Sequence, residues 1–62
     1  MAWKAALVFD DDSEIEIPEE YDSKDEAFNE GLDYGDEYYS YSDKIRVWNT
    51  DDPDDDHMYT RR

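Results

Sequence analysis

Apolar and polar residues alternate in three separate stretches of the chain, which is the pattern of half-buried β-strands. In residues 3–9, WKAALVF, apolar side chains recur at every second position. Residues 14–17, EIEI, alternate glutamate with isoleucine, and Pro18 then ends the run because proline cannot donate a ladder hydrogen bond. Residues 44–48, KIRVW, alternate again. Since only the acidic turn residues 10–13 separate the first two runs, these two runs predict a β-hairpin.

Between the second and third runs the apolar residues are spaced three and four apart, which predicts an α-helix. The helix should begin at Lys24, because Ser23 and Glu26 have the spacing of a capping box, in which each side chain accepts a hydrogen bond from an open backbone amide. The inward stripe of this helix contains Gly31 and Gly35, each of which costs about 1 kcal/mol in a helix interior. We interpret them as room for the helix to lie close to the sheet. The alternative is that the helix ends early at Gly35.

The element order β-β-α-β predicts an α+β fold, with a small antiparallel sheet and one helix packed on one face. Residues 1–49 would form this single compact domain. Residues 50–62 contain the acidic stretch TDDPDDDH, for which we expect either a flexible tail or an acidic loop leading to a short fourth strand at residues 58–60. A chain of this length buries only about 60% of its unfolded surface. Because it has no cysteine for disulfides, its stability depends on one small apolar core.

Such a core leaves no residues to line a ligand pocket of roughly 300 Å³ or more, so we predict neither an enzyme nor a cofactor. Asp52, Asp54 and Asp56 are spaced like the ligands at positions 1, 3 and 5 of an EF-hand calcium loop. However, His57 stands where that loop needs glycine, and the twelfth position would fall beyond Arg62. His57 is the single histidine, and without cysteine it does not make a dedicated metal site. We therefore predict no metal site.

Charge is the dominant property of the composition, with 20 acidic and 6 basic residues and a net charge of −14. Such a chain repels nucleic acid and anionic membranes and attracts basic surfaces. Strong acidity can indicate disorder, but two tryptophans, two phenylalanines and six tyrosines argue for a folded chain. No apolar run reaches the length of about 18 residues that a membrane helix needs. The lack of cysteine and of a signal-peptide pattern predicts a cytoplasmic protein.

The acidic residues fall on several predicted elements: the hairpin turn, the outer faces of the second strand and the helix, and the late acidic run. A compact chain of this length has a radius of gyration of about 10–11 Å and spans roughly 25–30 Å. Over that span duplex DNA carries about 15 charges, which is comparable to the net charge here. We therefore predict an inhibitor that occludes a basic DNA- or RNA-binding surface of another protein. The predicted contact residues are Asp10, Asp11, Asp12, Glu14, Glu16, Glu30, Asp33, Glu37, Asp51, Asp52, Asp54, Asp55 and Asp56.

Two other functions fit the same composition. One is an acidic interaction module that recruits a partner without competing with nucleic acid. The other is adaptation to high salt, which also gives many acidic residues and few lysines. Trp48 and Tyr34 are candidate anchors of an interface, since tryptophan and tyrosine are common hot spots. Alternatively they pack in the core, which we favour for Trp48.

The end of the second strand and the start of the helix carry a resemblance to a known class of proteins. Ile17-Pro18 ends the strand, and residues 22–27, DSKDEA, begin the helix. In this pattern residues 3–49 resemble the small acidic proteins with which bacteriophages inhibit DNA- or RNA-handling enzymes of the host, including podophage inhibitors of bacterial RNA polymerase. The resemblance implies that negative strands and loops bind a basic protein in the host cytoplasm, such as an RNA polymerase, a nucleoid protein, a nuclease or a CRISPR effector. It matches no diagnostic residue set, so it does not single out one partner.

Overall fold

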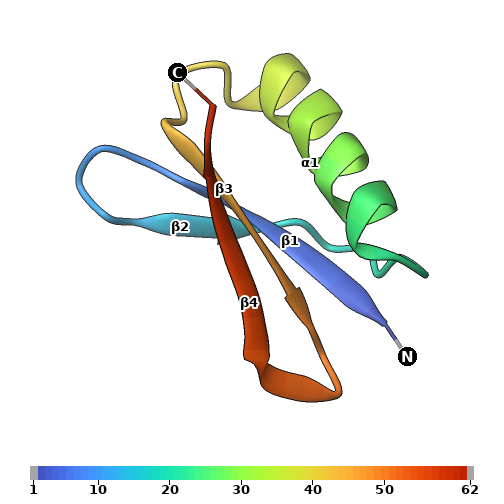
Figure 1. The fold of residues 1–62 in the computed structure, drawn as a ribbon. Coiled ribbons are helices and arrows are strands. Elements are labelled where there is room, and N and C mark those ends of the chain that lie inside the picture. Colours follow the sequence, from blue (N-terminus) through green and yellow to red (C-terminus); the bar gives the residue numbers. More distant parts are fainter. Residues whose placement is uncertain (1, 62) are drawn as a thin grey trace.

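The computed structural model describes residues 2–61, which form a four-stranded antiparallel sheet with one helix on one face (Figure 1). In chain order the elements are β1 (Trp3–Val8), β2 (Glu14–Glu16), α1 (Lys24–Tyr38), β3 (Lys44–Asn49) and β4 (Asp52–Thr60). The strands lie in the order β2-β1-β3-β4, so β1 and β3 are central and the other two are edges. This confirms the predicted α+β class. Within the described residues, no helix has both the length and the apolar character to cross a membrane.

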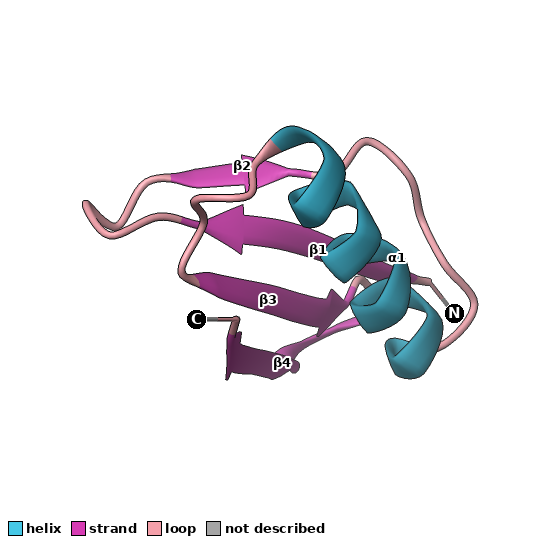
Figure 2. Ribbon diagram, turned by 90° about the horizontal axis from the view of Figure 1, so that it is seen from above, coloured by secondary structure: helices cyan, strands magenta, loops and turns pink. Residues whose placement is uncertain are grey.

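The helix covers one face of the sheet, where it packs on β1 and β3 (Figure 2). Because side chains alternate along a strand, every second residue points to the opposite face, which no helix or strand within residues 2–61 covers. We call this second face the open face. It carries Lys4, Ala6 and Val8 of β1, Glu14 and Glu16 of β2, Arg46 and Trp48 of β3, and Asp56 and Met58 of β4.

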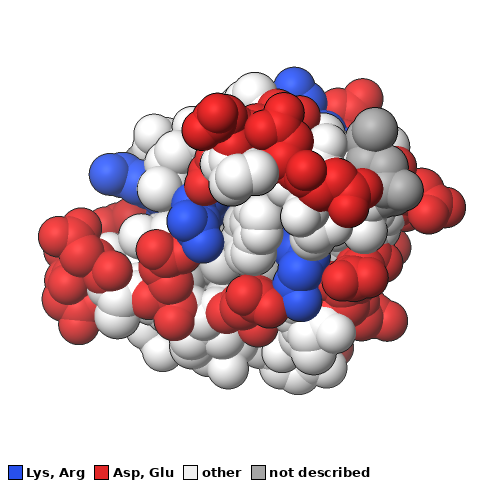
Figure 3. Space-filling model, turned by 90° about the horizontal axis from the view of Figure 1, so that it is seen from below, with Lys and Arg blue, Asp and Glu red and all other residues white. Residues whose placement is uncertain are grey.

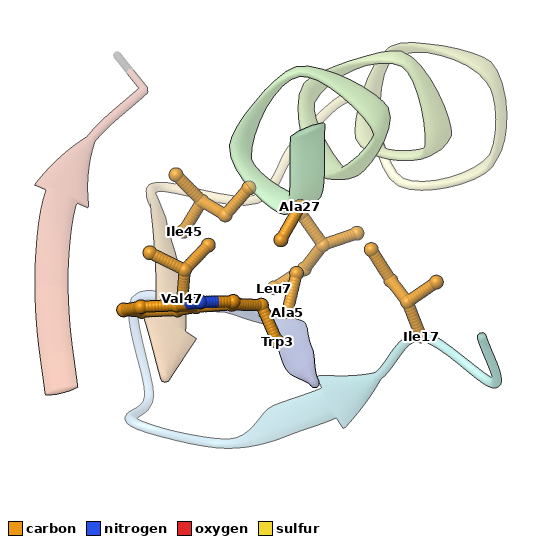
Figure 4. Packing of buried hydrophobic residues seen from close by; sticks show 7 residues of the cluster. All are labelled: Trp3, Ala5, Leu7, Ile17, Ala27, Ile45 and Val47. Carbon is orange, nitrogen blue, oxygen red and sulfur yellow. The ribbon is translucent and has the colours of Figure 1, made fainter. Parts of the chain in front are cut away.

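The apolar core lies between α1 and the two central strands (Figure 4). Its buried side chains are Trp3, Ala5, Leu7, Ile17, Ala27, Ile45 and Val47. A Cβ atom at Gly31 would clash with Cδ1 of Ile45, so glycine lets the helix lie close to the sheet as predicted. The helix continues through Gly35 to Tyr38, and the alternative of an early end at Gly35 is therefore wrong.

The start of the helix follows from local hydrogen bonding. Ser23 is the N-cap, and its hydroxyl accepts a hydrogen bond from the amide of Glu26 at 3.1 Å. The Glu26 carboxylate accepts a hydrogen bond from the amide of Asp22 at 3.1 Å. A capping box would use the amide of the N-cap residue Ser23, so the observed donor lies one residue earlier. The predicted first helical residue, Lys24, is confirmed.

Residues 52–60 differ most from the sequence expectations. They form one nine-residue strand, β4, antiparallel to β3, rather than a tail or a loop with a strand limited to residues 58–60. Most of the stretch TDDPDDDH therefore lies in a strand. Pro53 is tolerated because β4 is an edge strand whose register with β3 shifts between Trp48 and Asn49, so no ladder donor is needed at that point.

Candidate functional site

The open face of the sheet places acidic and basic side chains next to each other. Lys4 Nζ lies 2.6 Å from the Glu16 carboxylate. Arg46 lies 3.2 Å from Glu14 on one side and 3.4 Å from Asp56 on the other. Figure 3, which views this face, shows blue basic side chains among red acidic ones. These three predicted contact residues therefore face cations of their own chain, which neutralise much of their charge.

Trp48 lies on the same open face and is half-buried. The guanidinium carbon of Arg46 lies 4.4 Å from the centre of its ring, a cation–π arrangement. Trp48 is thus outside the core cluster, in which the tryptophan is Trp3, and the expectation that it packs in the core is wrong. Tyr34 is partly buried against the core, and its ring lies 4.8 Å from that of Tyr38.

The outer side of α1 carries a stripe of exposed carboxylates. We call it the helix stripe, and its members are Glu26, Glu30, Asp33 and Glu37. Their spacing of four, three and four residues sets them in one line, and like charges at this spacing cost about 0.2–0.5 kcal/mol per pair. Glu37 is also unfavourable near the end of the helix, where the dipole favours cations and no basic residue occupies the last turn. Glu26, in the first turn, stabilises the helix, whereas the like-charge neighbours along the stripe and the position of Glu37 oppose helix stability.

Glu26 belongs to the helix stripe but is not among the contact residues that the sequence predicts. Its place in the capping box gave it a structural role, and the structure confirms that role through its bond to the amide of Asp22. Its spacing of four residues from Glu30 is the sequence signal that places it on the same side of the helix.

The turn between β1 and β2 holds its aspartates in a defined shape. The amide of Phe9 donates to the carbonyl of Ser13 at 2.9 Å, and the amide of Asp12 donates to the carbonyl of Phe9 at 3.0 Å. Asp12 has a φ of 70°, a left-handed conformation that aspartate tolerates. Asp11 Oδ1 accepts from the hydroxyl of Ser13 at 2.6 Å and from its amide at 3.0 Å. These bonds, the hydroxyl bond first, lower the pKa of Asp11 below its ordinary value of 3.8 and keep it ionised. Asp10 is the third aspartate of this exposed turn.

The acidic run at residues 51–56 lies mostly in β4. Asp56 points to the open face, whereas Asp55 Oδ1 lies 2.7 Å from Nε2 of His57. Asp52 Oδ1 accepts from the amide of Asp54 at 3.1 Å. Asp56 faces Arg46 and Asp55 faces His57, and the register shift between Trp48 and Asn49 interrupts the regular pairing before them, so these groups do not converge. Among residues 2–61, no group of three or more His, Cys, Asp or Glu side chains is placed to hold a metal ion.

The structure places the predicted contact residues on several sides of the molecule. The sheet register pairs Trp3 with Asn49 and Val8 with Lys44. The β1–β2 turn that follows Val8 and the exposed Asp51 that follows Asn49 therefore lie at opposite ends of the sheet (Figure 1). The helix stripe lies on the helix side and the ion-paired acids on the open face. Exposed acidic groups consequently surround the protein rather than gather in one patch.

A surface hollow of about 320 Å³ lies beside the β1–β2 turn, and we call it the hairpin hollow. Its lining residues are Phe9, Asp10, Asp11, Ser13, Glu14, Ile15 and Tyr41. The hollow is open to solvent and lies outside the core, beside the turn that extends beyond the helix (Figure 2). The expectation that the core leaves no residues for a ligand pocket therefore stays a prediction. The lowered pKa of Asp11 is the opposite of what a general acid needs.

No protein-family model, no curated protein and no solved structure matches this chain. A function must therefore follow from the chemistry of its own residues.

Proposed function

We propose that this protein binds a basic surface of a nucleic-acid-binding protein and excludes the nucleic acid from it. The proposal depends on a difference in ion pairing between two groups of acidic residues. The open face neutralises its own carboxylates through Lys4 and Arg46, whereas the helix stripe is exposed and repels itself. A cationic surface that met the helix stripe would relieve this repulsion on binding.

The dimensions and charge support a phosphate-like role. The Cα atoms have a radius of gyration of 10.6 Å and extend over 30 × 20 × 17 Å. Along the 30 Å axis a DNA duplex carries about 18 charges, against a net charge of −14 here. The carboxylates of the helix stripe follow each other at about 5.5 Å along the helix axis. Charges along one strand of a duplex follow at about 3.4 Å, which is the same scale. Carboxylates would thus occupy positions that phosphates otherwise take.

A displacement experiment tests the proposal. The protein is immobilised, loaded with a bacterial lysate, and then washed with duplex DNA or with salt of the same ionic strength. We expect DNA to release the retained proteins at concentrations where the matched salt does not, because both ligands compete for one basic surface. If DNA leaves the retained proteins bound, the protein is instead an acidic module that recruits a partner without blocking nucleic acid.

Two variants with the same net charge show which acidic groups bind. The open-face variant carries Glu14→Gln, Glu16→Gln and Asp56→Asn. The stripe variant carries Glu30→Gln, Asp33→Asn and Glu37→Gln. Each removes three negative charges, so each has a net charge of −11 in place of −14. We expect the stripe variant to associate more slowly with the captured partner and the open-face variant to associate at nearly the original rate. Equal slowing of both variants would show that total charge, rather than the helix stripe, controls binding.

A further inference from the structure

We propose that the outer edge of β4 binds an extended basic segment of a partner protein as a fifth strand of the sheet. Strand addition of this kind joins two chains through main-chain hydrogen bonds, while pockets for alternate side chains give selectivity. The inference goes beyond the proposed function, because it assigns a second contact outside the helix stripe and requires no nucleic acid. It follows from the direction of the backbone groups of β4, from a hollow beside that strand and from the charge at one end of it.

Alternate backbone groups of β4 point away from the sheet. The amide of Arg61, one residue beyond β4, donates to the carbonyl of Asp43 at 2.7 Å, so the backbone of Arg61 faces β3. Because successive residues of a strand direct their N–H and C=O groups to opposite edges, Tyr59 and His57 also face β3. The outward groups in the regular part of the strand belong to Asp56, Met58 and Thr60, and we call them the β4 edge. Within residues 2–61 no strand pairs with the β4 edge (Figure 2).

The β4 edge is more open than the other edge of the sheet. Natural proteins blunt the edges of a sheet with short strands, proline or charge. The opposite edge strand, β2, has only three residues, and Pro18 follows it closely. In β4 the proline is Pro53, which lies before the regular pairing that runs from Asp56 to Thr60. This regular part therefore offers an uninterrupted template for another strand.

A hollow on the helix side of the sheet lies beside the β4 edge. Its volume is about 190 Å³, and its lining residues are Lys24, Asp25 and Phe28 of α1 and Tyr59 of β4. The rings of Phe28 and Tyr59 lie 5.0 Å apart, edge to face. In an added antiparallel strand, the residue opposite Tyr59 forms a non-hydrogen-bonded pair, in which side chains come closest. An apolar side chain at that position would pack against the two rings.

The charge of β4 selects a basic segment and gives it a direction. Asp54, Asp55 and Asp56 lie at the start of the β4 edge, whereas Arg61 follows its other end. Opposite charges directly across two strands stabilise their pairing, and like charges oppose it. The net charge of −14 also repels a second copy of this chain. The occupant that fits is therefore an antiparallel strand with an apolar residue opposite Tyr59, followed by basic residues from the position opposite Asp56 onward.

A short peptide tests this inference on the intact protein. Its sequence is acetyl-TIVTRTR-amide, which in antiparallel register sets isoleucine opposite Tyr59 and the first arginine opposite Asp56. Hydrogen–deuterium exchange followed by two-dimensional NMR reports on each backbone amide. We expect the peptide to slow exchange at the three amides of the β4 edge. The amides of Glu14 and Glu16, on the opposite edge strand, should keep their exchange rates.

N-methylation gives a matched pair of control peptides. In the antiparallel register the valine directs its amide to β4, whereas the threonine that follows it directs its amide away. Methylation of the valine amide should abolish binding, and methylation of that threonine amide, which adds the same group, should leave it. A peptide with glutamate in place of both arginines, acetyl-TIVTETE-amide, should not bind, because its charges would face those of β4.

Variants of the protein test the same contact from the other side. Met58→Pro removes one outward donor without removing a bond to β3, since an edge strand tolerates proline where its N–H faces solvent. It should abolish peptide binding, whereas Met58→Ala keeps the donor and should bind. Asp56→Asn should weaken binding about two- to fivefold, as the loss of one cross-strand charge pair predicts. If Met58→Pro does not fold by circular dichroism, the two methylated peptides still decide on the unaltered protein.

Three results would overturn strand addition at β4. They are equal binding of the two methylated peptides, equal protection of the amides in β2, and a β4 edge that is already protected in the free protein, as pairing with a second copy would cause. The failure of the proposed function looks different, because there DNA would fail to displace the captured partner while the peptide still protected the β4 edge. The two proposals are therefore tested separately.

Discussion

Arg61, just beyond the end of β4, reaches the C-terminal end of α1, where its Nη2 lies 2.5 Å from Oδ1 of Asp36. Its Nη1 donates to the carbonyl of Ser42 at 2.9 Å and also to the Ser42 hydroxyl. The Arg61 side chain is 6% exposed, whereas that of Asp36 is 75% exposed. Because α1 has no basic residue in its last turn, Arg61 supplies the positive charge that the helix dipole favours there.

Removal of Arg61 should destabilise the protein more than removal of its carboxylate partner. Arg61→Gln leaves the backbone carbonyl of the buried Ser42 without its donor, and we expect a loss of about 1–3 kcal/mol in the free energy of unfolding. Asp36→Asn breaks an exposed ion pair and should cost less than about 1 kcal/mol. Urea denaturation of both variants measures the difference. Equal losses would mean that the ion pair, not the bond to Ser42, holds the end of the chain.

The close approach of Gly31 to Ile45 should make an added methyl group unfavourable. A Cβ atom at Gly31 would clash with Cδ1 of Ile45, the end of a side chain that can turn aside, and would lie 3.2 Å from Cβ of Ala5, which is fixed to the backbone of β1. Overpacking costs about 1–3 kcal/mol, and the better helix propensity of alanine returns only about 1 kcal/mol. We expect Gly31→Ala to lower the melting temperature.

Ile45→Val removes the Cδ1 atom that Gly31→Ala would meet. A double-mutant cycle should therefore show favourable coupling between the two substitutions, because the second relieves the overpacking that the first creates. Thermal unfolding of the two single variants and the double variant measures the coupling. A melting temperature that rises for Gly31→Ala alone would contradict the close helix–sheet approach.

The two charge-matched variants should also differ in stability. The stripe variant loses like-charge repulsion along α1, and we expect it to be more stable than the original protein by roughly 0.5 kcal/mol. The open-face variant loses cross-strand ion pairs with Lys4 and Arg46 and should be less stable by roughly 0.2–1 kcal/mol. Thermal unfolding at low salt, where screening is weakest, measures both. A shift of the same sign in both variants would show that net charge alone sets the stability.

Moderate salt should stabilise the free protein and weaken its complex. Added ions screen the repulsion among 20 acidic residues in the folded chain, and they also screen its attraction to a basic partner. Urea denaturation and association rates, measured from about 0.05 to 0.5 M KCl, follow the two effects. A protein adapted to high salt would instead be unfolded at the low end of this series by circular dichroism.

Tyr21 should make the protein less stable at alkaline pH. Burial, followed by the charges of Glu19 and Glu30, raises the pKa of Tyr21 above its ordinary value of 10.0. Since the folded state holds this proton more tightly than the unfolded chain, the phenol contributes stability below pH 10 that is lost as the pH rises through the raised pKa. Tyr21→Phe should reduce the loss between pH 9 and pH 11 in urea denaturation. An equal loss in Tyr21→Phe and in the original protein would show that this phenol does not cause the alkaline instability.

Local patterns were sufficient to predict the fold class and most element boundaries. Ser23 and Glu26 determine the helix start because their hydrogen bonds join residues only three or four positions apart. The alternation in residues 14–17 places Ile17 in the core, because the side-chain period of a strand is two. Such signals are contained in short stretches of chain, and no distant partner is needed to interpret them.

The extent of β4 could not be predicted, because its first residues have no apolar alternation. Asp56 lies in the strand because β3 pairs with it and brings Arg46 within 3.4 Å. The stabilising contacts therefore come from a different segment, across the sheet. A polar run such as TDDPDDDH has the same local pattern whether it forms a loop, a tail or an edge strand.

The sequence by itself determined the helix start, the alternating strands, the α+β class and the strong negative charge, because these depend on neighbouring residues or on composition. Only the tertiary structure decided which carboxylates are neutralised and which are exposed. Glu14 and Glu30 are indistinguishable as acidic positions in the sequence, yet strand register sets Glu14 against Arg46 and helix geometry leaves Glu30 in the exposed stripe. The electrostatic role of a charge depends on the distance to its nearest opposite charge, and folding alone determines that distance.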